Sequence, residues 1–296
     1  MNAADHSESF LPVASIIIPA HNEDTVIGRC LDRIRSDSQA SFEVVVVVNG
    51  SSDRTGDVAV DHLRHHPAAV VEVIPTASKI AALRRGDEIA QTYPRVYLDA
   101  DIQVSARALT DLARVLADHA EPAVGAPRMV VDTRGCGWAL RAYHNVWTRL
   151  PYAEDGVIGA GIYAVNEAGG AVKGTFPDVM NDDAYVRGVF GPDQRLTTPG
   201  VFIVAAPRTV AALVRRRARV HIGNEAVEEM VTGSGRSTTR SALLRIVRRR
   251  EATVGEVAAY VWITAAAFAV ARVRRLRGTH AQWSTDVTSR VLQEHE

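Results

Sequence analysis

The chain has 296 residues, 47% of them hydrophobic, and a formal net charge of zero, which together indicate a globular protein with a packed core. It contains two cysteines, Cys30 and Cys136, without any Cys-x-x-Cys spacing, which suggests neither a disulfide framework nor a zinc site. The first residues, MNAADHSESF, lack the basic start and long apolar core of a secretory signal peptide, so we expect the main domain to face the cytoplasm.

Short apolar runs alternate with helical patterns in the first third of the chain. The apolar runs are residues 15–20, 42–48, 69–74 and 95–99, and the helical patterns follow at 23–37, 53–66, 78–92 and 105–119. Continuous apolar strands that alternate with helices are typical of a mostly parallel sheet covered on both faces. The sequence therefore predicts an α/β fold of the nucleotide-binding type.

Polar residues follow three of the four predicted strands. Pro19-Ala20-His21-Asn22-Glu23 follows the first strand, Asn49-Gly50-Ser51-Ser52-Asp53 the second, and Asp99-Ala100-Asp101 the fourth. In parallel sheets of this kind, ligands bind beyond the carboxyl ends of the strands. We therefore expect the three clusters to converge on one edge of the sheet.

The two aspartates in RVYLDADIQVS stand at the end of an apolar strand. In an extended strand residues i and i+2 point to the same face, so Asp99 and Asp101 are expected to aim together off the strand end. Like charges that close repel each other. The pair is tolerable if it is well solvated, if it caps the helix that begins near Ser105, or if a cation lies between the carboxylates.

The rear of the chain is basic. Residues 207–250 hold 11 arginines and 3 glutamates, a net charge of +8, whereas residues 1–206 hold 18 basic and 26 acidic side chains. This asymmetry suits a pyrophosphate or an anionic membrane surface better than DNA, because the arginines lack interleaved aromatic residues. Solvated helix faces are the alternative for most of these arginines.

An apolar stretch at 257–271 follows a predicted flexible break at 232–239 and a basic helix that ends near Arg250. Its 15 residues give a helix of roughly 22 Å, short of the ~30 Å hydrocarbon thickness of a bilayer. Arginine clusters at 245–250 and 272–277 flank it. We predict that residues 239–277 dock on a membrane surface without crossing it; a helix packed on the main domain is the alternative.

The order of the motifs resembles glycosyltransferase family two, with its GT-A fold. The motifs are an N-x-E after the first strand, an N-G-S-S-D-R-T turn, a lysine in SKIAALRRG, a D-x-D, a Gly-rich segment and a late acidic pair. The resemblance covers roughly residues 13–225 and leaves 226–296 as a C-terminal helical extension. It implies an inverting, metal-dependent enzyme that moves a sugar from a nucleotide-sugar donor to an acceptor hydroxyl. The Q-x-x-R-W motif of processive synthases is absent, which argues for one sugar per encounter.

The same resemblance implies roles on the donor side. Asp101 would hold a divalent cation, Mg²⁺ or Mn²⁺, which would neutralise the leaving diphosphate. Asp99 would accept a hydrogen bond from a ribose hydroxyl or reach the metal through water. Asn49 stands where the family often has an aspartate near the base. The other expected donor-side residues are Pro19, Asn22 and Glu23, around the base and ribose, and Lys79, beside the base or the diphosphate.

On the acceptor side, Asp182-Asp183 in FPDVMNDDAYVRG resembles the late acidic pair, whose second member deprotonates the acceptor hydroxyl. We therefore predict Asp183 as the catalytic base, with Asp178 as a nearby competitor. Acidic residues at a helix start are also favoured by the helix dipole without any reactive role. Gly159 and Gly161 in GVIGAGIYAVNEAGG would let a sugar approach the backbone; a bulged core strand is the alternative.

Two further groups are weaker candidates. In RRRARVHIGN, a guanidinium could clamp the leaving diphosphate and His221 could complete the metal shell, but exposed surface residues are the alternative. The candidates in this run are Arg215, Arg216, Arg217, Arg219 and His221, of which we favour Arg217, Arg219 and His221. Trp138 and Trp147 could stack on an acceptor sugar, or belong to the core.

Other functional classes remain to be distinguished. A catalytically silent nucleotide-sugar-binding scaffold would have the same fold but would tolerate loss of Asp183. A sugar nucleotidyltransferase normally has a Gly-rich phosphate loop after the first strand, where this chain has PAHNEDT, and no strand is followed by the G-x-G-x-x-G of a dinucleotide oxidoreductase. The expected partners are a nucleotide sugar and an acceptor, lipid-linked or a small molecule; no nucleic acid is expected.

Overall fold

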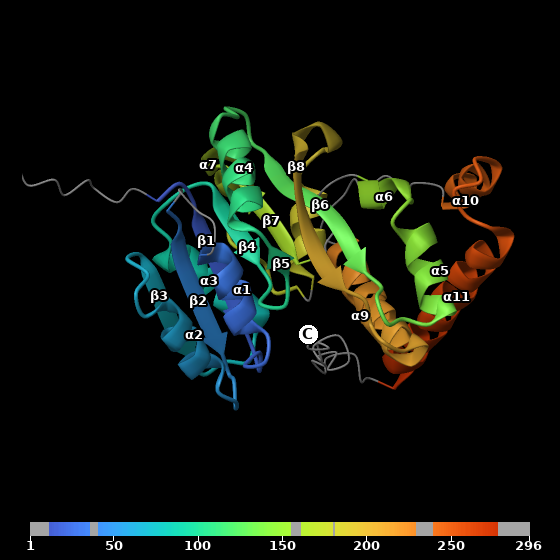
Figure 1. Ribbon diagram of the computed structural model, residues 1–296, viewed down its shortest axis with the longest axis horizontal. Helices are drawn as coiled ribbons and strands as arrows, with labels where there is room; N and C mark the ends of the chain where they lie inside the picture. The colour runs from blue at the N-terminus through green and yellow to red at the C-terminus, as the bar shows by residue number, and fades with distance from the viewer. Residues whose placement is uncertain (1–11, 36–40, 155–160, 180, 229–238, 278–296) are drawn as a thin grey trace, which may run out of the picture.

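The computed structural model describes residues 12–35, 41–154, 161–179, 181–228 and 239–277. These residues form an eight-stranded sheet with helices on both faces, and the last helices gather beside one end of the sheet (Figure 1). The α/β fold with a C-terminal helical extension is therefore confirmed. The strands are β1 Ser15–Ala20, β2 Glu43–Asn49, β3 Ala69–Ile74, β4 Arg95–Leu98, β5 Gln103–Val104, β6 Val124–Asp132, β7 Ile162–Val165 and β8 Arg195–Ala205.

The helices that accompany the sheet follow the predicted positions in the front half of the chain. They are α1 Ile27–Arg35, α2 Thr55–Leu63, α3 Lys79–Ile89, α4 Ala106–Ala117, α5 Trp138–Trp147, α6 Pro151–Glu154, α7 Glu167–Lys173, α8 Asp182–Val189, α9 Val210–Glu228, α10 Thr239–Arg248 and α11 Val254–Leu276, with a short 3₁₀ turn at Pro192–Gln194.

The strand order is β3-β2-β1-β4-β7-β6-β8-β5. Strands β3, β2, β1 and β4 run parallel, as the alternation of strands and helices predicts. Strand β7 is antiparallel to both β4 and β6, β6 and β8 are parallel, and β5 is antiparallel to β8. The front half of the sheet is thus parallel and the rear half is mixed.

The parallel strands are buried on both faces. Every residue of β1 and β2 is buried, and alternate side chains enter different cores: Ile16 and Ile18 pack with α1, α2 and α4, while Ile17 packs with α3 and α8. Serines cap the two helices nearest the predicted site. The Ala81 N–H donates to Ser78 Oγ, and the Ala108 N–H donates to Ser105 Oγ. Ser105, and not the aspartate pair, therefore caps α4.

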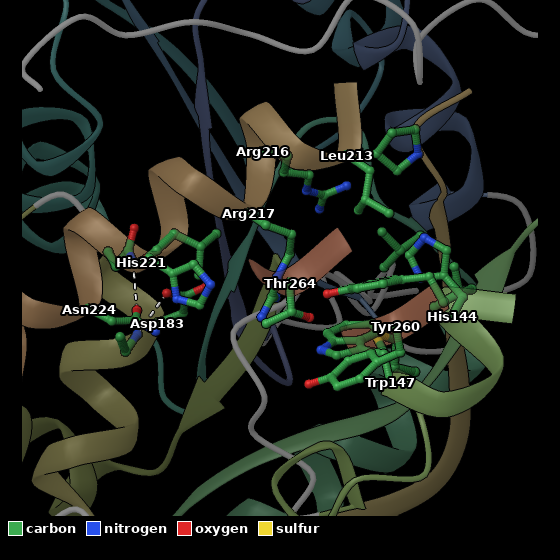
Figure 2. Close-up of a pocket in the computed structure, with 18 of the residues that line it drawn as sticks. His144, Trp147, Asp183, Leu213, Arg216, Arg217, His221, Asn224, Tyr260 and Thr264 are labelled. Atoms are coloured by element: carbon green, nitrogen blue, oxygen red, sulfur yellow. Dashed lines mark hydrogen bonds between the residues drawn. The ribbon is translucent and has the colours of Figure 1, made fainter. Parts of the chain in front are cut away.

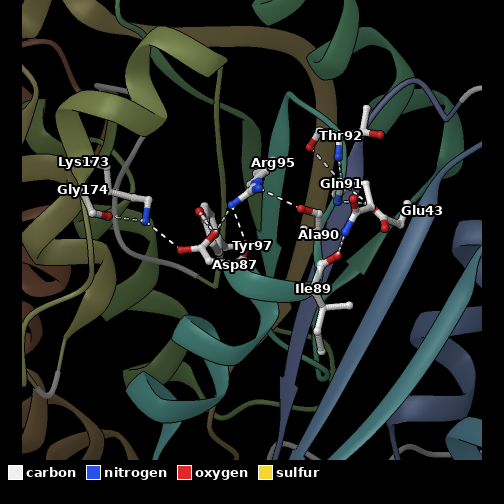
Figure 3. A network of polar contacts seen from close by, with 11 residues as sticks. Glu43, Asp87, Ile89, Ala90, Gln91, Thr92, Arg95, Tyr97, Lys173 and Gly174 are labelled. Atoms are coloured by element: carbon white, nitrogen blue, oxygen red, sulfur yellow. Dashed lines mark hydrogen bonds and ion pairs between the residues drawn. The ribbon is translucent and has the colours of Figure 1, made fainter.

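A buried polar network closes the edge where β1, β2 and β4 begin (Figure 3). The Asp87 carboxylate accepts hydrogen bonds from Arg95 (3.1 Å), Lys173 (3.0 Å) and the Tyr97 hydroxyl (2.7 Å). Lys173 is 3% exposed and also donates to the Gly174 carbonyl. These contacts join α3, β4 and the end of α7.

The C-terminal helices pack on the rear of the sheet through a separate core. It includes Tyr143 of α5, Leu213 of α9, and Tyr260 and Ile263 of α11. The predicted domain boundary at residue 225 falls inside α9, and residues 232–238 of the predicted break lie outside the described part of the chain.

The apolar helix α11 is longer than expected. It has 23 residues, or about 34 Å at 1.5 Å per residue, because a Thr253–Glu256 capping box starts it before the apolar run and the arginines after Ala271 continue it. The prediction that it is too short to cross a bilayer was wrong. By length and composition alone α11 could span a membrane, although such a helix is also found in protein cores.

Candidate active site

The first two polar clusters converge at the carboxyl edge of the sheet, as expected. The Asn22 N–H donates to Ser51 Oγ (3.0 Å), and the Ser52 N–H donates to Asn22 Oδ1 (2.9 Å). Asn22 adopts a left-handed backbone conformation, with φ of +54°, which lets its amide reach back across the loop. The Glu23 N–H donates to Thr55 Oγ1 (2.8 Å), and the Glu23 side chain is buried.

Asn49 and Pro19 are buried in the floor of this edge. With its amide oriented to satisfy its neighbours, Asn49 donates to the Ala20 carbonyl (3.0 Å) and accepts from the Ser78 N–H (3.3 Å). This side chain therefore links the end of β1 to the start of α3. An amide suits that position because it can donate and accept at once, which an ionised aspartate cannot.

The aspartate pair lies in a turn and not on an extended strand. Strand β4 ends at Leu98, and the Ile102 N–H donates to the Asp99 carbonyl (3.1 Å). The premise that both aspartates lie on an extended strand was therefore wrong, because a turn begins directly after Leu98. Asp101 is exposed, whereas the Asp99 side chain is 36% exposed and faces Lys79.

Lys79 joins the donor-side and acceptor-side carboxylates. Its Nζ lies 2.7 Å from Asp99 Oδ1 and 2.8 Å from Asp182 Oδ1. Burial opposes the charged form of the lysine, but Asp182, Asp99 and Asp183 outweigh burial and raise its pKa. Lys79 is therefore a fixed positive charge among three aspartates. The contact with Asp182 is one that its sequence motif did not predict.

Asp182 and Asp183 differ in their surroundings although they are adjacent at the start of α8. The Asp182 side chain is 4% exposed, and its Oδ2 accepts from the Tyr163 hydroxyl (3.0 Å). Asp183 Oδ1 accepts a hydrogen bond from the Ala184 N–H (2.7 Å). Burial, and next the charge of Asp182, raise the pKa of Asp183 to about 6. A carboxylate with such a pKa is mostly ionised at neutral pH and can accept a proton there.

Asp183 lies between two hollows of the structure. One is a narrow crevice, too tight for a water molecule, whose lining includes the expected donor-side residues Pro19, Lys79 and Asp99. The other is a cavity of about 720 Å³ between the rear of the sheet and the C-terminal helices. Among the described lining residues, Asp183 alone belongs to both. The crevice is lined by Pro19, Lys79, Leu83, Tyr97, Leu98, Asp99, Gly161, Tyr163, Asp182 and Asp183.

The large cavity runs from Asp183 to a group of aromatic side chains (Figure 2). Figure 2 shows Asp183, Asn224 and His221 at one end, and Tyr260, Trp147 and His144 at the other. Arg216 and Arg217 of α9 and Thr264 of α11 lie between these ends. The C-terminal helices thus form much of the wall of the cavity that Asp183 lines at one end.

The remaining candidates on α9 and α5 separate into two groups. Arg217, His221 and Trp147 line the cavity, as does Arg216. The described lining residues do not include Arg215, Arg219 or Trp138. Arg215 is exposed. Trp138 is 58% exposed and lies outside the cavity, against the first turn of α11. Figure 2 places His221 on the Asp183 side of the cavity, where its ring stacks on Phe268 at 4.0 Å.

Two other predicted residues also have defined surroundings. Asp178 is 88% exposed and forms an ion pair with Arg84 (2.9 Å), away from both hollows. Gly161 has φ of +89°, and a Cβ there would lie 2.8 Å from Ile102 and 3.0 Å from Asp99 Oδ2. A glycine is therefore required for the close approach of β7 to the aspartate turn. Gly159 lies outside the described residues.

The donor set fits a divalent cation only with help from a ligand. Three carboxylates, Asp99, Asp182 and Asp183, surround a single ammonium group, and the carboxylate of Asp101 is exposed on the adjoining turn. This excess of carboxylate oxygen suits a hard cation. Within the described residues no three His, Cys, Asp or Glu side chains form a metal site, so a cation would need further oxygen ligands from a bound diphosphate or water.

Several residues of the site carry no signal in the sequence. Tyr163 lies in the short apolar strand β7, and His144 and Tyr260 lie in helices that read as core. Their roles depend on packing between distant segments. The alternation of β7 indicates only that Tyr163 shares a face with Val165, and not that its hydroxyl meets Asp182.

Comparisons with known proteins agree with this geometry. The family model described as Glycosyl transferase family 2 matches residues 15–165. The chain is 27% identical over 130 residues to an uncharacterized glycosyltransferase, EpsJ, of Bacillus subtilis, covering 43% of this chain and 34% of EpsJ. It is 33% identical over 98 residues to a dolichyl-phosphate beta-glucosyltransferase of Drosophila melanogaster, covering 29% and 30% of the two chains. The matches thus span about a third of the length of these relatives.

A solved structure extends the likeness to the rest of the fold. The mannosyltransferase PcManGT from Pyrobaculum calidifontis, in complex with GDP-Man and Mn²⁺, superposes with a TM-score of 0.59 at 23% identity. The match covers 92% of this chain and 84% of PcManGT. At this identity the likeness establishes the fold, including the C-terminal part that the family model does not reach.

Proposed function

Because the chain belongs to glycosyltransferase family 2, with a model match over residues 15–165, we propose that it moves one sugar from a nucleotide-sugar donor to an acceptor hydroxyl, with inversion. One observation carries the proposal. Asp183, a half-buried carboxylate with a pKa raised to about 6, lines both the crevice that contains Lys79 and Asp99 and a cavity large enough for an acceptor.

The donor binds at the carboxyl edge of the parallel strands. The loops after β1 and β2 form one hydrogen-bonded surface through Asn22, which supports a pocket for the base and ribose there. Asp99 lies next to this surface and is held by Lys79. Pro19, Glu23 and Asn49 complete the buried floor.

Transfer requires a base on the acceptor side. The Asp183 carboxylate takes the proton from the acceptor hydroxyl, and the hydroxyl oxygen forms a bond to the anomeric carbon. The bond from that carbon to the diphosphate oxygen breaks on the opposite face, and the nucleoside diphosphate leaves with the electron pair. Lys79 forms an ion pair with Asp182, and burial followed by the charge of Asp182 raises the pKa of Asp183.

A divalent cation belongs to this proposal. Asp101 and Asp99 would hold it, and it would supply neutralisation of the charge that develops on the leaving diphosphate. PcManGT, which shares the fold, is solved with Mn²⁺ and GDP-Man, and this supports a cation of that class.

The test separates donor binding from transfer. We expect a nucleotide sugar with Mn²⁺ to raise the melting temperature of the wild-type protein, because a ligand that binds the native state stabilises it. Asp183→Asn should keep that shift and lose transfer by about 10²- to 10⁴-fold. Asp178→Asn is the matched control and should leave both unchanged, because Asp178 is exposed and ion-paired elsewhere.

Two results would contradict the proposal. If Asp182→Asn abolishes transfer and Asp183→Asn does not, the wrong carboxylate has been assigned as the base. If the protein binds nucleotide sugars and Asp183→Asn changes no measurable property, the catalytically silent scaffold is the better description.

We also propose that α10 and α11 dock on a membrane surface. Along α11 the large apolar side chains Val254, Trp262, Phe268 and Leu276 are each more than half exposed, while Tyr260 and Ile263 on the opposite side pack against the α5–α9 core. Arginines cluster at both ends of the helix, at 245–250 and 272–277. A helix already packed along one side, with cations at both ends, suits an anionic interface.

Flotation with liposomes tests the docking. We expect binding to anionic vesicles that weakens at high salt, and loss of binding in Trp262→Glu. Val60→Glu, a change at a 51% exposed valine of α2, is the matched control and should still float. Release by detergent alone would favour a spanning helix, and no binding to any vesicle would favour a helix that only packs on the domain.

A further inference from the structure

A pair of asparagines joins the first turn of α8 to α9, beside the candidate base. Asn181, which directly precedes Asp182 and Asp183, donates from Nδ2 to the Val220 carbonyl (3.1 Å) and to Asn224 Oδ1 (2.7 Å). An asparagine at the start of a helix usually caps that helix with its own side chain, but the Asn181 side chain makes no capping hydrogen bond to α8. Its amide is instead committed to α9.

A glycine inside α9 makes room for this contact. A Cβ at Gly223 would lie 2.6 Å from the amide atoms of Asn181. Glycine in the interior of a helix is less favourable than alanine, because it loses more backbone freedom on folding. The amide of Asn181 therefore occupies space that any other helical residue at position 223 would fill.

The hydrogen-bond partners fix which way the Asn224 amide faces. The Val220 carbonyl can only accept, so the group that approaches it is the NH₂ of Asn181. The same NH₂ meets Asn224, which therefore presents its oxygen to Asn181. This leaves the NH₂ of Asn224 without a hydrogen-bond partner among the described residues, and Asn224 lines the large cavity. Asn224 is thus an oriented donor in the cavity wall.

This donor lies at the end of the cavity where the candidate base is. Figure 2 shows Asn224, Asp183 and His221 at that end. The His221 Nε2 is enclosed by protein atoms, so Asn224 is the better placed of the two to reach a ligand. The charges of Asp182 and Asp99 already repel the Asp183 carboxylate, so an anionic group beside it is disfavoured. A neutral amide donor next to these carboxylates suits a neutral oxygen atom.

We propose that Asn224 determines acceptor specificity: its NH₂ donates a hydrogen bond to a neutral oxygen atom next to the hydroxyl that Asp183 deprotonates. The acceptor therefore carries two neighbouring oxygens at the reacting end, as a vicinal diol or its monoether does. Asn181 is a positioning residue, because it orients the Asn224 amide and holds the turn that carries Asp183. This inference deepens the proposed function and depends on it, since it assigns the chemistry of the acceptor at the same site.

Transfer of the sugar from UDP-glucose or GDP-mannose, with Mn²⁺, to three small alcohols tests the proposal. The alcohols are cyclohexanol, which has one oxygen, trans-1,2-cyclohexanediol, which has a second hydroxyl, and trans-2-methoxycyclohexanol, whose second oxygen can only accept a hydrogen bond. In the wild type, kcat/KM for the diol and for the methyl ether should each be about tenfold above that for cyclohexanol, because each gains one hydrogen bond.

The sharpest variant is Asn224→Asp, whose carboxylate still accepts from Asn181 but cannot donate. Its ratio of kcat/KM for the methyl ether over cyclohexanol should fall from about ten to about one. Asn224→Leu should lose the ratio as well. Because the ratio compares two acceptors in one variant, a general loss of activity or of folded protein cancels. Arg215→Gln, at an exposed residue of the same helix that does not line the cavity, is the matched control and should keep the wild-type ratio.

Asn181→Ala tests the positioning role. It removes the amide that orients Asn224, so the ratio of the methyl ether over cyclohexanol should fall in this variant too. If Asn181 only stabilises the fold, Asn181→Ala should lower the melting temperature and leave the ratio at about ten.

Three outcomes would overturn the inference. Equal kcat/KM for all three alcohols in the wild type would show that the second oxygen is not recognised. A ratio that survives in Asn224→Asp and Asn224→Leu would assign the recognition to another residue. A wild type that favours the diol but treats the methyl ether like cyclohexanol would show that the protein accepts a hydrogen bond there and does not donate one.

Donor binding separates this inference from the proposed function. If a nucleotide sugar with Mn²⁺ raises the melting temperature of the wild type but no alcohol is glycosylated in a way that depends on its second oxygen, the acceptor inference fails and the glycosyltransferase proposal stands. If no nucleotide sugar binds, the proposed function itself fails.

Discussion

Two buried polar clusters lie at opposite ends of one stacked tyrosine pair, and they carry opposite imbalances of charge. Tyr97 and Tyr163 are cross-strand partners on β4 and β7, with ring centroids 4.9 Å apart. The Tyr97 hydroxyl donates to Asp87 in the network of Figure 3, and the Tyr163 hydroxyl donates to Asp182. We call them the Asp87 cluster (Asp87, Arg95, Tyr97, Lys173) and the Asp182 cluster (Lys79, Asp99, Tyr163, Asp182, Asp183).

In the Asp87 cluster one carboxylate faces two cations. The pKa of Lys173 is lowered, mainly by burial. The negative charge of Asp87 opposes this shift, and the positive charge of Arg95 adds to it. In the Asp182 cluster one ammonium group faces three carboxylates, and the pKa of Asp183 is raised to about 6. The first cluster is closed by its own hydrogen bonds. The second has negative charge in excess, which suits a bound cation and a proton acceptor, and this is the difference between a structural network and a reactive one.

The largest effect is expected from removing the carboxylate that we propose as the ligand of the cation. Asp101→Asn should abolish metal-dependent turnover, by at least about 10³-fold, and leave the melting temperature without ligand unchanged, because Asp101 is exposed. Steady-state kinetics with Mn²⁺ and with excess chelator measure this. The exposed Asp118→Asn is the control. Full activity in Asp101→Asn, or of the wild type in chelator, would contradict the assignment.

The next prediction compares the stability of two variants in which the lysine of one cluster is replaced by methionine. Lys173→Met should lower the free energy of unfolding by about 3 kcal/mol, since Lys173 is almost fully buried, with no rescue by Mn²⁺. Lys79→Met should also destabilise the protein, but Mn²⁺ should restore part of the loss, because a cation can take up the excess charge there. Denaturant unfolding with and without Mn²⁺ measures both. Equal behaviour of the two variants toward Mn²⁺ would remove the distinction between the clusters.

A smaller effect is expected from pH. Since the pKa of Asp183 is about 6, the transfer rate should be constant above that value and fall about tenfold per pH unit below it. The stability effect has the opposite sign: a carboxyl with a raised pKa binds its proton more tightly in the folded state, so ionisation above pH 6 destabilises the fold. Asp183→Asn should therefore melt higher than the wild type at pH 8, and the difference should vanish below about pH 4, near the ordinary value of 3.8. A rate that is flat from pH 8 to pH 5 would argue against this base.

The smallest effect concerns the tyrosine pair. Tyr97→Phe and Tyr163→Phe each remove one hydroxyl and keep the stacked rings, so each should lower the free energy of unfolding by about 1 kcal/mol. Only Tyr163→Phe should also shift the acidic limb of the pH–rate profile upward. The Asp182 carboxylate loses the hydroxyl dipole that partly offsets its charge, so its repulsion of the Asp183 carboxylate increases and raises the pKa of Asp183 further. A shift in Tyr97→Phe of the same size would show that the clusters titrate as one.

Local sequence patterns determined the front half of the fold. The runs at β1 and β2 are apolar at almost every position, as a strand buried on both faces requires. The side chains of Ser78 and Ser105 cap the first turns of α3 and α4, so these residues indicate where the helices begin. The placement of polar residues at strand ends also brought Asn22 and Ser51 together, because parallel strands end on one edge. These features depend on neighbours close in sequence, and so the sequence could predict them.

Only the tertiary structure decided how the distant segments meet. Lys79 and Asp182 are a hundred residues apart in the chain, and their contact depends on the packing of α8 beside α3 and on Tyr163 of β7 beneath them. The turn at Asp99 to Asp101 depends on β4 ending against Gly161, whose missing Cβ leaves room for it. The cavity that Arg216 and His144 line exists because α5, α9 and α11 pack together. Helical periodicity records which face of a helix is buried, but not which helix covers it, and that pairing is set by the shape of the assembled core.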